Sequence, residues 1–280
     1  MTRIDSHQHF WRYDAARDGW ITDDMRAIRR DFLPPDLEPV LEANRIDGCV
    51  AVQADQSLDE TRFLLDLARR HRFIKGVVGW VDLRSPQIDA SLDEFCAEPL
   101  FCGVRHVAQA EADDFLERED VVRGIGRLAR RGLTYDILIV ERQLSAAIAL
   151  ASRLPDQRFV LDHLAKPRIK DRVIEPWRGA IRELARRPNV CCKLSGLVTE
   201  ADWHHWQPGD LRPYLDVVFE AFGPDRLMWG SDWPVCLVAA PYERVLETIV
   251  EYASALSVTE QGALFGRNAE RFYGLVLRQD

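Results

Sequence analysis

Eight short runs of apolar, β-prone residues recur along the chain, and a longer stretch with helical spacing of its apolar residues follows each run. The runs cover residues 3–10, 48–53, 74–83, 101–107, 133–140, 158–164, 190–197 and 227–234. Because eight alternations of strand and helix match a closed parallel barrel, the sequence predicts a (β/α)8 TIM barrel. Such barrels run to about 250 residues as one unit, so we expect one domain over residues 1–280.

The rival architecture is a doubly wound open sheet, which shows the same alternation. That sheet usually carries a glycine-rich phosphate-binding turn after its first strand, whereas this chain has His-Gln-His there. The pattern therefore favours the barrel, whose chemistry lies at the carboxyl ends of the strands.

The connections between the runs carry helix signals and two long loops. Ser57 with Glu60 three residues later predicts the start of one helix, and Pro213 is expected to lie near the start of another. Residues 11–35 and 203–213 contain no Gly/Ser-rich or low-complexity tract, so we interpret them as active-site loops rather than linkers.

Composition excludes several classes of partner. A formal net charge of −8 argues against a surface that follows nucleic-acid phosphates. No stretch reaches the roughly 18 uncharged apolar residues that cross a bilayer, and the first residues lack a basic and then apolar leader. The six cysteines include no C-x-x-C pair, so we expect buried, reduced thiols. These features predict a cytoplasmic protein without nucleic-acid or membrane partners, and they leave its oligomeric state open.

Four polar side chains stand at the ends of predicted strands. His7 and His9 are two residues apart on one strand, so both point into the same space, and two imidazoles hold a divalent cation at about 2.0–2.1 Å. His163 closes the sixth run and Asp232 lies near the end of the eighth. We expect the four to meet at the rim where barrel enzymes place catalysis, although independent structural roles are the alternative reading.

Three motifs carry a resemblance to a known family. The segments DSHQH at 5–9, VLDHLAKP at 160–167 and GSDWP at 230–234 resemble signatures of the amidohydrolase superfamily. More narrowly, they resemble its branch of sugar lactonases (L-fucono- and L-rhamnono-lactonase-like) and pyrone dicarboxylate lactonases. The resemblance covers essentially the whole chain and implies a (β/α)8-barrel hydrolase that opens a cyclic ester.

The resemblance also bears on the metal. Binuclear members carry a bridging carboxylated lysine or glutamate on strand four and a histidine on strand five, where this chain offers Arg105 or His106 and Asp136. A two-metal site is therefore not expected. At most one zinc-like ion fits, held by a set that consists of His7, His9, Asp232 and the nearby His163. In this branch the ion is dispensable in some enzymes, so its necessity stays open.

Lactone hydrolysis assigns roles to these residues. The reaction needs an activated water, a stabilised oxyanion and a protonated leaving alkoxide. We expect Asp232 to act as the base and His163 to orient or share the proton. A metal ion, or Arg105 with the strand-one imidazoles, would stabilise the oxyanion. The alternative for Arg105 is a structural ion pair with Asp82 or Asp136.

The remaining strand ends and loops offer aromatic faces beside hydrogen-bonding groups, which suit a sugar ring. The predicted substrate-binding residues are Gln53, Trp80, Arg105, Lys193, Trp11, Trp203 and His204. We expect Trp20, Trp177 and Trp229 to be core or hinge aromatics. Because Arg105 and Lys193 are the only clear cations, an uncharged aldonolactone is favoured over a pyrone dicarboxylate.

Three other functions remain as alternatives. A pyrone dicarboxylate lactonase shares the motifs, and a non-oxidative decarboxylase also uses strand-one histidines with a strand-eight aspartate but releases carbon dioxide. Phosphotriester hydrolysis is disfavoured because the bridging ligand of a binuclear centre is missing. A sugar-binding barrel without catalysis would turn over no lactone.

Overall fold

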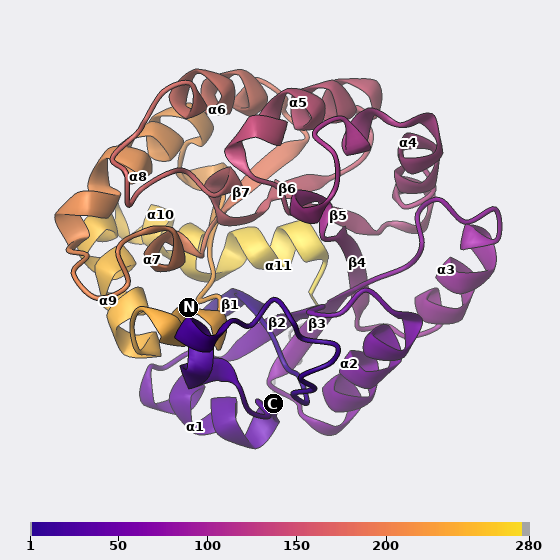
Figure 1. Ribbon diagram of the computed structural model, residues 1–280, viewed down its shortest axis with the longest axis horizontal. Helices are drawn as coiled ribbons and strands as arrows, with labels where there is room; N and C mark the ends of the chain where they lie inside the picture. The colour runs from indigo at the N-terminus through magenta and orange to yellow at the C-terminus, as the bar shows by residue number, and fades with distance from the viewer. Residues whose placement is uncertain (1, 276–280) are drawn as a thin grey trace.

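The computed structural model describes residues 2–275 and contains a parallel sheet whose strands follow one another in chain order (Figure 1). The strands are β1 (Ile4–Gln8), β2 (Gly48–Val52), β3 (Ile74–Gly79), β4 (Phe101–His106), β5 (Thr134–Ile137), β6 (Phe159–Leu161), β7 (Val190–Leu194) and β8 (Leu227–Trp229). Gln8 bridges Trp233 in parallel, and the His9 N–H donates to the Trp233 carbonyl at 2.7 Å, which joins the two edges of the sheet. The predicted (β/α)8 barrel is confirmed.

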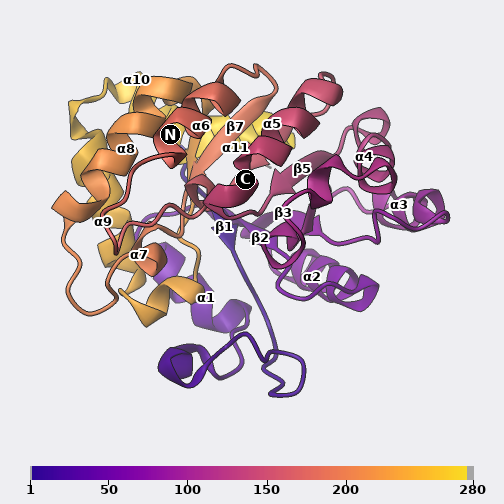
Figure 2. The same cartoon turned by 45° about the horizontal axis from the view of Figure 1, so that its top comes forward.

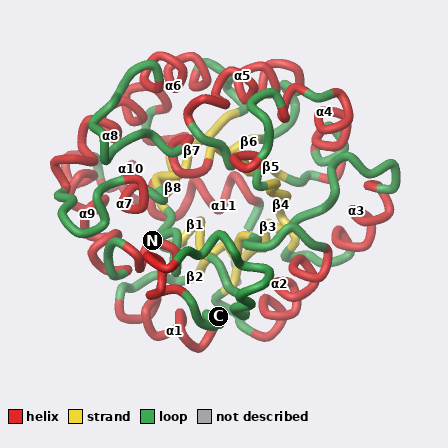
Figure 3. The backbone as a smooth tube through the Cα atoms, in the orientation of Figure 1, coloured by secondary structure: helices red, strands yellow, loops and turns green. Residues whose placement is uncertain are grey.

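Helices surround the ring of strands, as Figure 3 shows with helices in red and strands in yellow. They are α1 (Pro34–Ala43), α2 (Leu58–Arg70), α3 (Ile88–Cys96), α4 (Glu119–Ile125), α5 (Leu144–Arg153), α6 (Trp177–Ala185), α7 (Leu197–Glu200), α8 (Pro208–Phe222), α9 (Tyr242–Tyr252), α10 (Val258–Gly262) and α11 (Asn268–Tyr273). Helix α2 begins as predicted, since the Ser57 hydroxyl accepts the Glu60 backbone N–H at 3.1 Å. Pro213 lies in the first half of α8, which begins five residues earlier with Pro208 in its first turn.

All eight predicted runs contain a strand, but most of the strands end several residues before the run does. The sixth run, 158–164, shows the reason. Residues His163 to Lys166 all have positive φ values between 51° and 59°, so the chain leaves the sheet in a left-handed turn directly after β6. The polar residues at the ends of the runs therefore lie on the loops that form the mouth of the barrel.

The floor of the barrel is apolar and closed by the last helix. Inward-facing side chains pack against Phe272 and Tyr273 of α11, which lies across the centre of the view in Figure 1. These side chains are Ile4, Val50, Val52, Val78, Cys102, Val160 and Met228. The site at the opposite end is thereby shielded from water on its lower side.

The segment after β1 leaves the barrel before it returns at α1, as the indigo ribbon in Figure 2 shows. It contains the short 3-10 helix Asp23–Ile28. No helix within residues 2–275 is long and apolar enough to cross a membrane.

All six cysteines are free, as expected. Four are buried, but Cys96 is exposed and Cys191 is partly exposed, so the prediction of uniformly buried thiols is wrong for these two. Cys96 is the last residue of α3 and Cys191 is the second residue of β7.

Candidate active site

The two strand-one histidines meet at the mouth of the barrel. Nε2 of His7 lies 3.2 Å from Nε2 of His9, and both side chains are buried. Nδ1 of His9 lies 2.8 Å from the Val52 carbonyl, which can only accept a hydrogen bond. The hydrogen of neutral His9 is therefore on Nδ1, and the Nε2 lone pair faces His7.

Asp232 reaches the same point from the segment after β8. Its backbone N–H donates to the His7 carbonyl at 2.8 Å, and its φ of 59° turns the chain toward β1. Oδ1 of Asp232 lies 3.4 Å from Nε2 of His9 and 3.7 Å from Nε2 of His7. A positive φ at a buried carboxylate stores backbone strain of about 1–3 kcal/mol, which is typical of functional sites.

His163 stands on the left-handed turn after β6. Its Nδ1 lies 2.9 Å from the Ser195 hydroxyl, and its Nε2 lies 3.9 Å from Oδ1 of Asp232. The ring of His163 fits here because Gly196 has no side chain: a Cβ on Gly196 would lie 2.6 Å from Nδ1 of His163. The structure thus brings together all four side chains that the sequence predicted to meet.

The donor set fits one metal ion. Nε2 of His7, Nε2 of His9 and Oδ1 of Asp232 are 3.2–3.7 Å apart. The edge of a tetrahedron around zinc with bonds of about 2.0–2.1 Å is about 3.3–3.4 Å. His7, Asp162 and His163 form a second group of close donor atoms. Since both groups share His7, the arrangement suits a single ion.

Beneath the histidines lies a buried ionic layer. Nζ of Lys193 contacts Oδ2 of Asp136 at 2.5 Å, Oδ1 of Asp162 at 3.1 Å and Nδ1 of His7 at 3.2 Å. The Tyr273 hydroxyl also donates to Asp136, at 2.7 Å. The side chain of Lys193 is fully buried, so the structure places it below the site and not at the mouth where the sequence analysis put it.

Arg105 lies inside the ligand cluster and is almost wholly buried. Its Nη1 is 3.2 Å from Oδ2 of Asp162 and 3.3 Å from Nε2 of His7, and its Nη2 donates to the Gln53 side chain at 3.0 Å. The carboxylate that pairs with Arg105 is therefore Asp162, and not Asp82 or Asp136. Gln53 serves in turn to hold the guanidinium.

Burial and charge fix the protonation states. Burial lowers the pKa of His163 to about 4, and it also lowers the pKa values of His7 and His9, so all three rings are neutral at pH 7. Burial by itself would raise the pKa of Asp232. Asp232 takes up its proton only at an acidic pH at which His163 and His9 are themselves protonated, and there the charge of His163 and the hydrogen bond from protonated His9 outweigh burial and lower the pKa of Asp232. The site thus holds an ionised carboxylate among neutral imidazoles.

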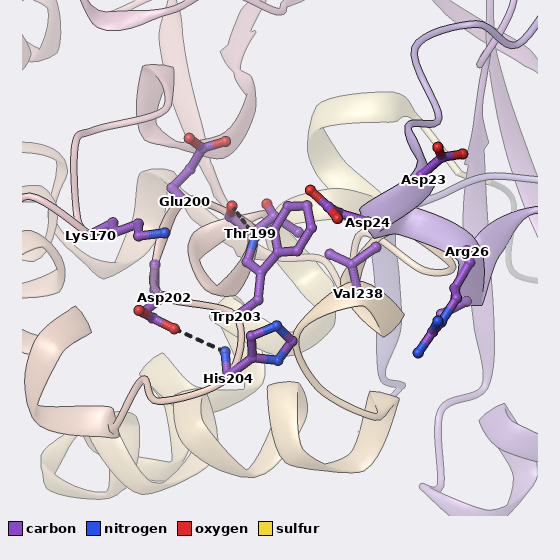
Figure 4. Close-up of a pocket in the computed structure, with 12 residues that line it drawn as sticks. Asp23, Asp24, Arg26, Lys170, Thr199, Glu200, Asp202, Trp203, His204 and Val238 are labelled. Carbon is purple, nitrogen blue, oxygen red and sulfur yellow. Dashed lines mark hydrogen bonds between the residues drawn. The ribbon is translucent and has the colours of Figure 1, made fainter.

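A pocket of about 830 Å³ lies between the two long loops (Figure 4). Figure 4 shows Trp203 in the middle of the lining, with Lys170 and Asp202 on one side and Asp23 and Arg26 on the other. The lining residues are Asp23, Asp24, Arg26, Ala27, Lys170, Thr199, Glu200, Ala201, Asp202, Trp203, His204 and Val238. Trp203 and His204 are the two predicted substrate-binding residues on this wall, and the loops predicted to be functional face one another across it.

Glu200 connects this pocket to the strand-end site. Burial raises its pKa and the charge of Asp232 adds to the rise, whereas Lys166, 3.6 Å away, opposes it. The sequence analysis missed Glu200, Lys166 and Asp162 as site residues. Lys166 and Asp162 were visible within the motif at 160–167, but their partners depend on how the loops and strands are staggered.

The other predicted aromatic residues lie apart from the pocket. Trp11 is buried, packs against Phe32 and donates to the Arg30 carbonyl at 2.9 Å, and its ring centroid lies 6.4 Å from that of His9. Trp80 is partly exposed and donates to His106 at 3.2 Å.

The three tryptophans expected to be core or hinge aromatics differ in their exposure. Trp177 and Trp229 are buried in the core. Trp20 is 45% exposed on the loop after β1, where its ring lies edge-on to Trp11 at 5.9 Å, so it is not a core aromatic.

Comparison with known proteins places this geometry in context. A family model described as amidohydrolase matches residues 4–275. An L-fucono-1,5-lactonase from Burkholderia multivorans is 46% identical over 285 residues, which cover 98% of this chain and 96% of that protein. The crystal structure of an amidohydrolase from Burkholderia multivorans with bound zinc has a TM-score of 0.93 at 46% identity and covers 99% of this chain and 100% of that chain. A probable 2-pyrone-4,6-dicarboxylic acid hydrolase from Acinetobacter baumannii shares the fold, with a TM-score of 0.78 at 16% identity over 98% of this chain and 100% of that one.

Proposed function

This chain belongs to the amidohydrolase family, and we propose that its strand-end site hydrolyses a sugar lactone such as L-fucono- or L-rhamnono-lactone to the free aldonic acid. The observation that carries the proposal is the convergence of His7, His9 and His163 on one ionised carboxylate, Asp232. The 46% identity to an L-fucono-1,5-lactonase over nearly the whole chain supports this choice of substrate class.

Asp232 is the proposed base. Its lowered pKa keeps it ionised, so it accepts a proton from the attacking water and later returns that proton to the ring oxygen. The neutral ring of His163, fixed by Ser195 at 2.9 Å, is close enough to share this proton. Arg105 places its positive charge 3.3 Å from His7, where it contributes to stabilising the oxyanion.

A carboxylate with a low pKa is a weak base, so the water must itself become more acidic. A zinc-like ion held by His7, His9 and Asp232, with His163 nearby, would supply this Lewis acidity when it is bound. The proposed hydrolysis does not require the ion, because Arg105 already provides a positive charge beside His7.

The substrate is proposed to lie between the strand-end site and the pocket beside it. Trp203 would stack on the ring, while His204 and Glu200 would contact its hydroxyl groups, and Gln53, Trp80 and Arg105 would complete the site from the strand ends. The pocket wall carries four carboxylates against two cations, which disfavours a dianionic pyrone dicarboxylate. We further propose a cytoplasmic location, since all six cysteines are free.

The test is a pH-indicator assay of the purified protein over a panel of aldonolactones. We expect one acid equivalent per ring opened and a decrease of turnover by about 100- to 10,000-fold in Asp232→Asn. Asp82→Asn is the matched control, because Asp82 is another strand-end carboxylate that pairs with Arg84 on the surface. Turnover of pyrone dicarboxylates alone, release of carbon dioxide, or ligand binding without turnover would each refute the proposal. Repeating the assay after chelation tests whether the ion is required.

A further inference from the structure

Each ring nitrogen of His7 has two polar groups close to it. Nδ1 lies 3.2 Å from Nζ of Lys193 and 3.4 Å from Oδ1 of Asp162. Nε2 lies 3.2 Å from Nε2 of His9 and 3.3 Å from Nη1 of Arg105. The ring is buried, and Lys193 and Arg105 place a positive charge beside each of its nitrogens, so His7 is neutral and carries one hydrogen, on one nitrogen or the other.

One tautomer leaves the site unable to bind a metal. An ammonium group can only donate, so Lys193 requires the lone pair of Nδ1 and leaves the hydrogen on Nε2 of His7. That hydrogen then points at the lone pair of Nε2 of His9, whose own hydrogen is on the side of the Val52 carbonyl. In this state the lone pairs of both histidines are occupied, and Nη1 of Arg105 donates to Oδ2 of Asp162 at 3.2 Å and not to His7.

The other tautomer opens the ligand set. With the hydrogen on Nδ1, His7 donates to Asp162, and Nε2 of His7 and of His9 both present lone pairs beside Asp232. A bound ion would replace Nη1 of Arg105 as the partner of Nε2 of His7. Oδ1 of Asp162 is buried and makes no hydrogen bond within residues 2–275, although Lys193 lies near it as an ion pair. A buried acceptor without a hydrogen bond is uncommon, and this tautomer would satisfy it. Carboxylates that accept from the second nitrogen of a metal-ligating histidine raise its affinity.

We propose that Lys193 and Asp162 compete for Nδ1 of His7 and thereby set the affinity of the His7, His9 and Asp232 group for a divalent ion. Lys193 favours the closed, metal-free state by its hydrogen bond and by its buried positive charge. Asp162 favours the open state. Both are positioning residues that act through His7, and the inference deepens the metal part of the proposed function.

The first experiment measures zinc affinity in the full chain by competition with a chromophoric chelator. Removing Lys193 alone would strand buried carboxylates, so the variant is Lys193→Met with Asp136→Asn, in which the amide oxygen still accepts from Tyr273. We expect this double variant to bind zinc at least about tenfold more tightly than Asp136→Asn, and Asp162→Asn to bind about 10- to 100-fold more weakly than the wild type. Lys75→Met removes the same charge at the amino end of β3, away from the strand-end site, and it should change the affinity far less.

The second experiment reads the tautomer of His7 directly. In 15N spectra of histidine-labelled, metal-free wild-type protein, with His7→Gln used for assignment, His7 should carry its hydrogen on Nε2. In the double variant it should carry it on Nδ1. A wild-type His7 with its hydrogen on Nδ1, or a double variant with unchanged or weaker zinc affinity than Asp136→Asn, would overturn the proposal. Neither measurement uses a lactone, so its failure is distinct from failure of the proposed hydrolysis.

Discussion

The backbone N–H of Ser231 donates to Oδ1 of Asp5 at 2.9 Å, a hydrogen bond that spans 226 positions of the chain. The same oxygen accepts the His7 N–H at 3.1 Å, and Oδ2 accepts the Tyr242 hydroxyl at 3.1 Å. One buried carboxylate therefore holds the strand that carries the histidines against the segment that carries Asp232. The geometry of the site depends on Asp5 even though it faces away from the substrate.

Asp5→Ala should destabilise the fold and impair the site together. Three buried donors lose their acceptor, and each costs about 1–3 kcal/mol, so we expect the free energy of unfolding to fall by at least about 3 kcal/mol. Tyr242→Phe removes only one of these bonds and should cost about 1 kcal/mol with activity retained. Urea titration and kcat measurements check both variants, and full activity in Asp5→Ala would contradict this view.

Gly196→Ala should lose activity by displacing His163. The new Cβ would lie 2.6 Å from Nδ1 of His163, at a φ of +65° that also strains an alanine. Gly132→Ala is a matched control, because Gly132 has a φ of +71° and no heavy atom within 4 Å of the added Cβ. Both substitutions should cost about 1–2 kcal/mol of stability, but only the first should lower kcat. Equal activities would show that the contact with His163 is unimportant.

Trp203→Ala should raise KM more than it lowers kcat. The indole is central to the pocket lining, and loss of an aromatic face against a ring is worth about 1 kcal/mol, which is about a fivefold change in affinity. Trp20→Ala serves as the comparison, because Trp20 is 45% exposed and lies outside the pocket lining. Steady-state kinetics with the lactone that is hydrolysed fastest give KM and kcat for both variants. A similar KM in the two variants would count against stacking on Trp203.

Stability should depend on pH through Glu60. Burial raises its pKa from 4.5 to about 7, so between these values the folded protein holds a proton that the unfolded chain has lost. The contribution of Glu60 to the free energy of unfolding should therefore fall by about 3 kcal/mol as the pH rises from 4.5 to about 7 and then level off, whereas the lowered pKa values of His7, His9 and His163 act in the opposite direction. Glu60→Gln should remove this contribution from the pH dependence, whereas Glu251→Gln at an exposed position of α9 should leave the pH dependence unchanged. Chemical unfolding at several pH values measures the free energy of unfolding. If this free energy has the same pH dependence in the wild type and in Glu60→Gln, the prediction for Glu60 is refuted.

The meeting of His7, His9, His163 and Asp232 could be predicted because each lies at the carboxyl end of a strand, and a closed barrel brings all such ends to one rim. The places of Lys193 and Trp11 could not be predicted in this way. Whether a residue near a strand end lies above or below the rim depends on the stagger between strands, which leaves no mark in the pattern of apolar residues. The direction of Trp11 depends on a loop that folds back on Phe32, and the pocket around Trp203 depends on two loops meeting.

Because α11 is the last helix in the chain, it is synthesised after all the strands, and this affects when the site is completed. As the chain is synthesised from its N-terminus, all eight strands emerge before α11, whose Phe272 and Tyr273 seal the floor and whose tyrosine hydroxyl binds Asp136. Until that helix docks, water can reach the charges of Asp136 and Lys193 from below. Maturation of the catalytic end is thus coupled to an event at the opposite end of the barrel, and a growing chain with every strand in place still lacks a finished interior.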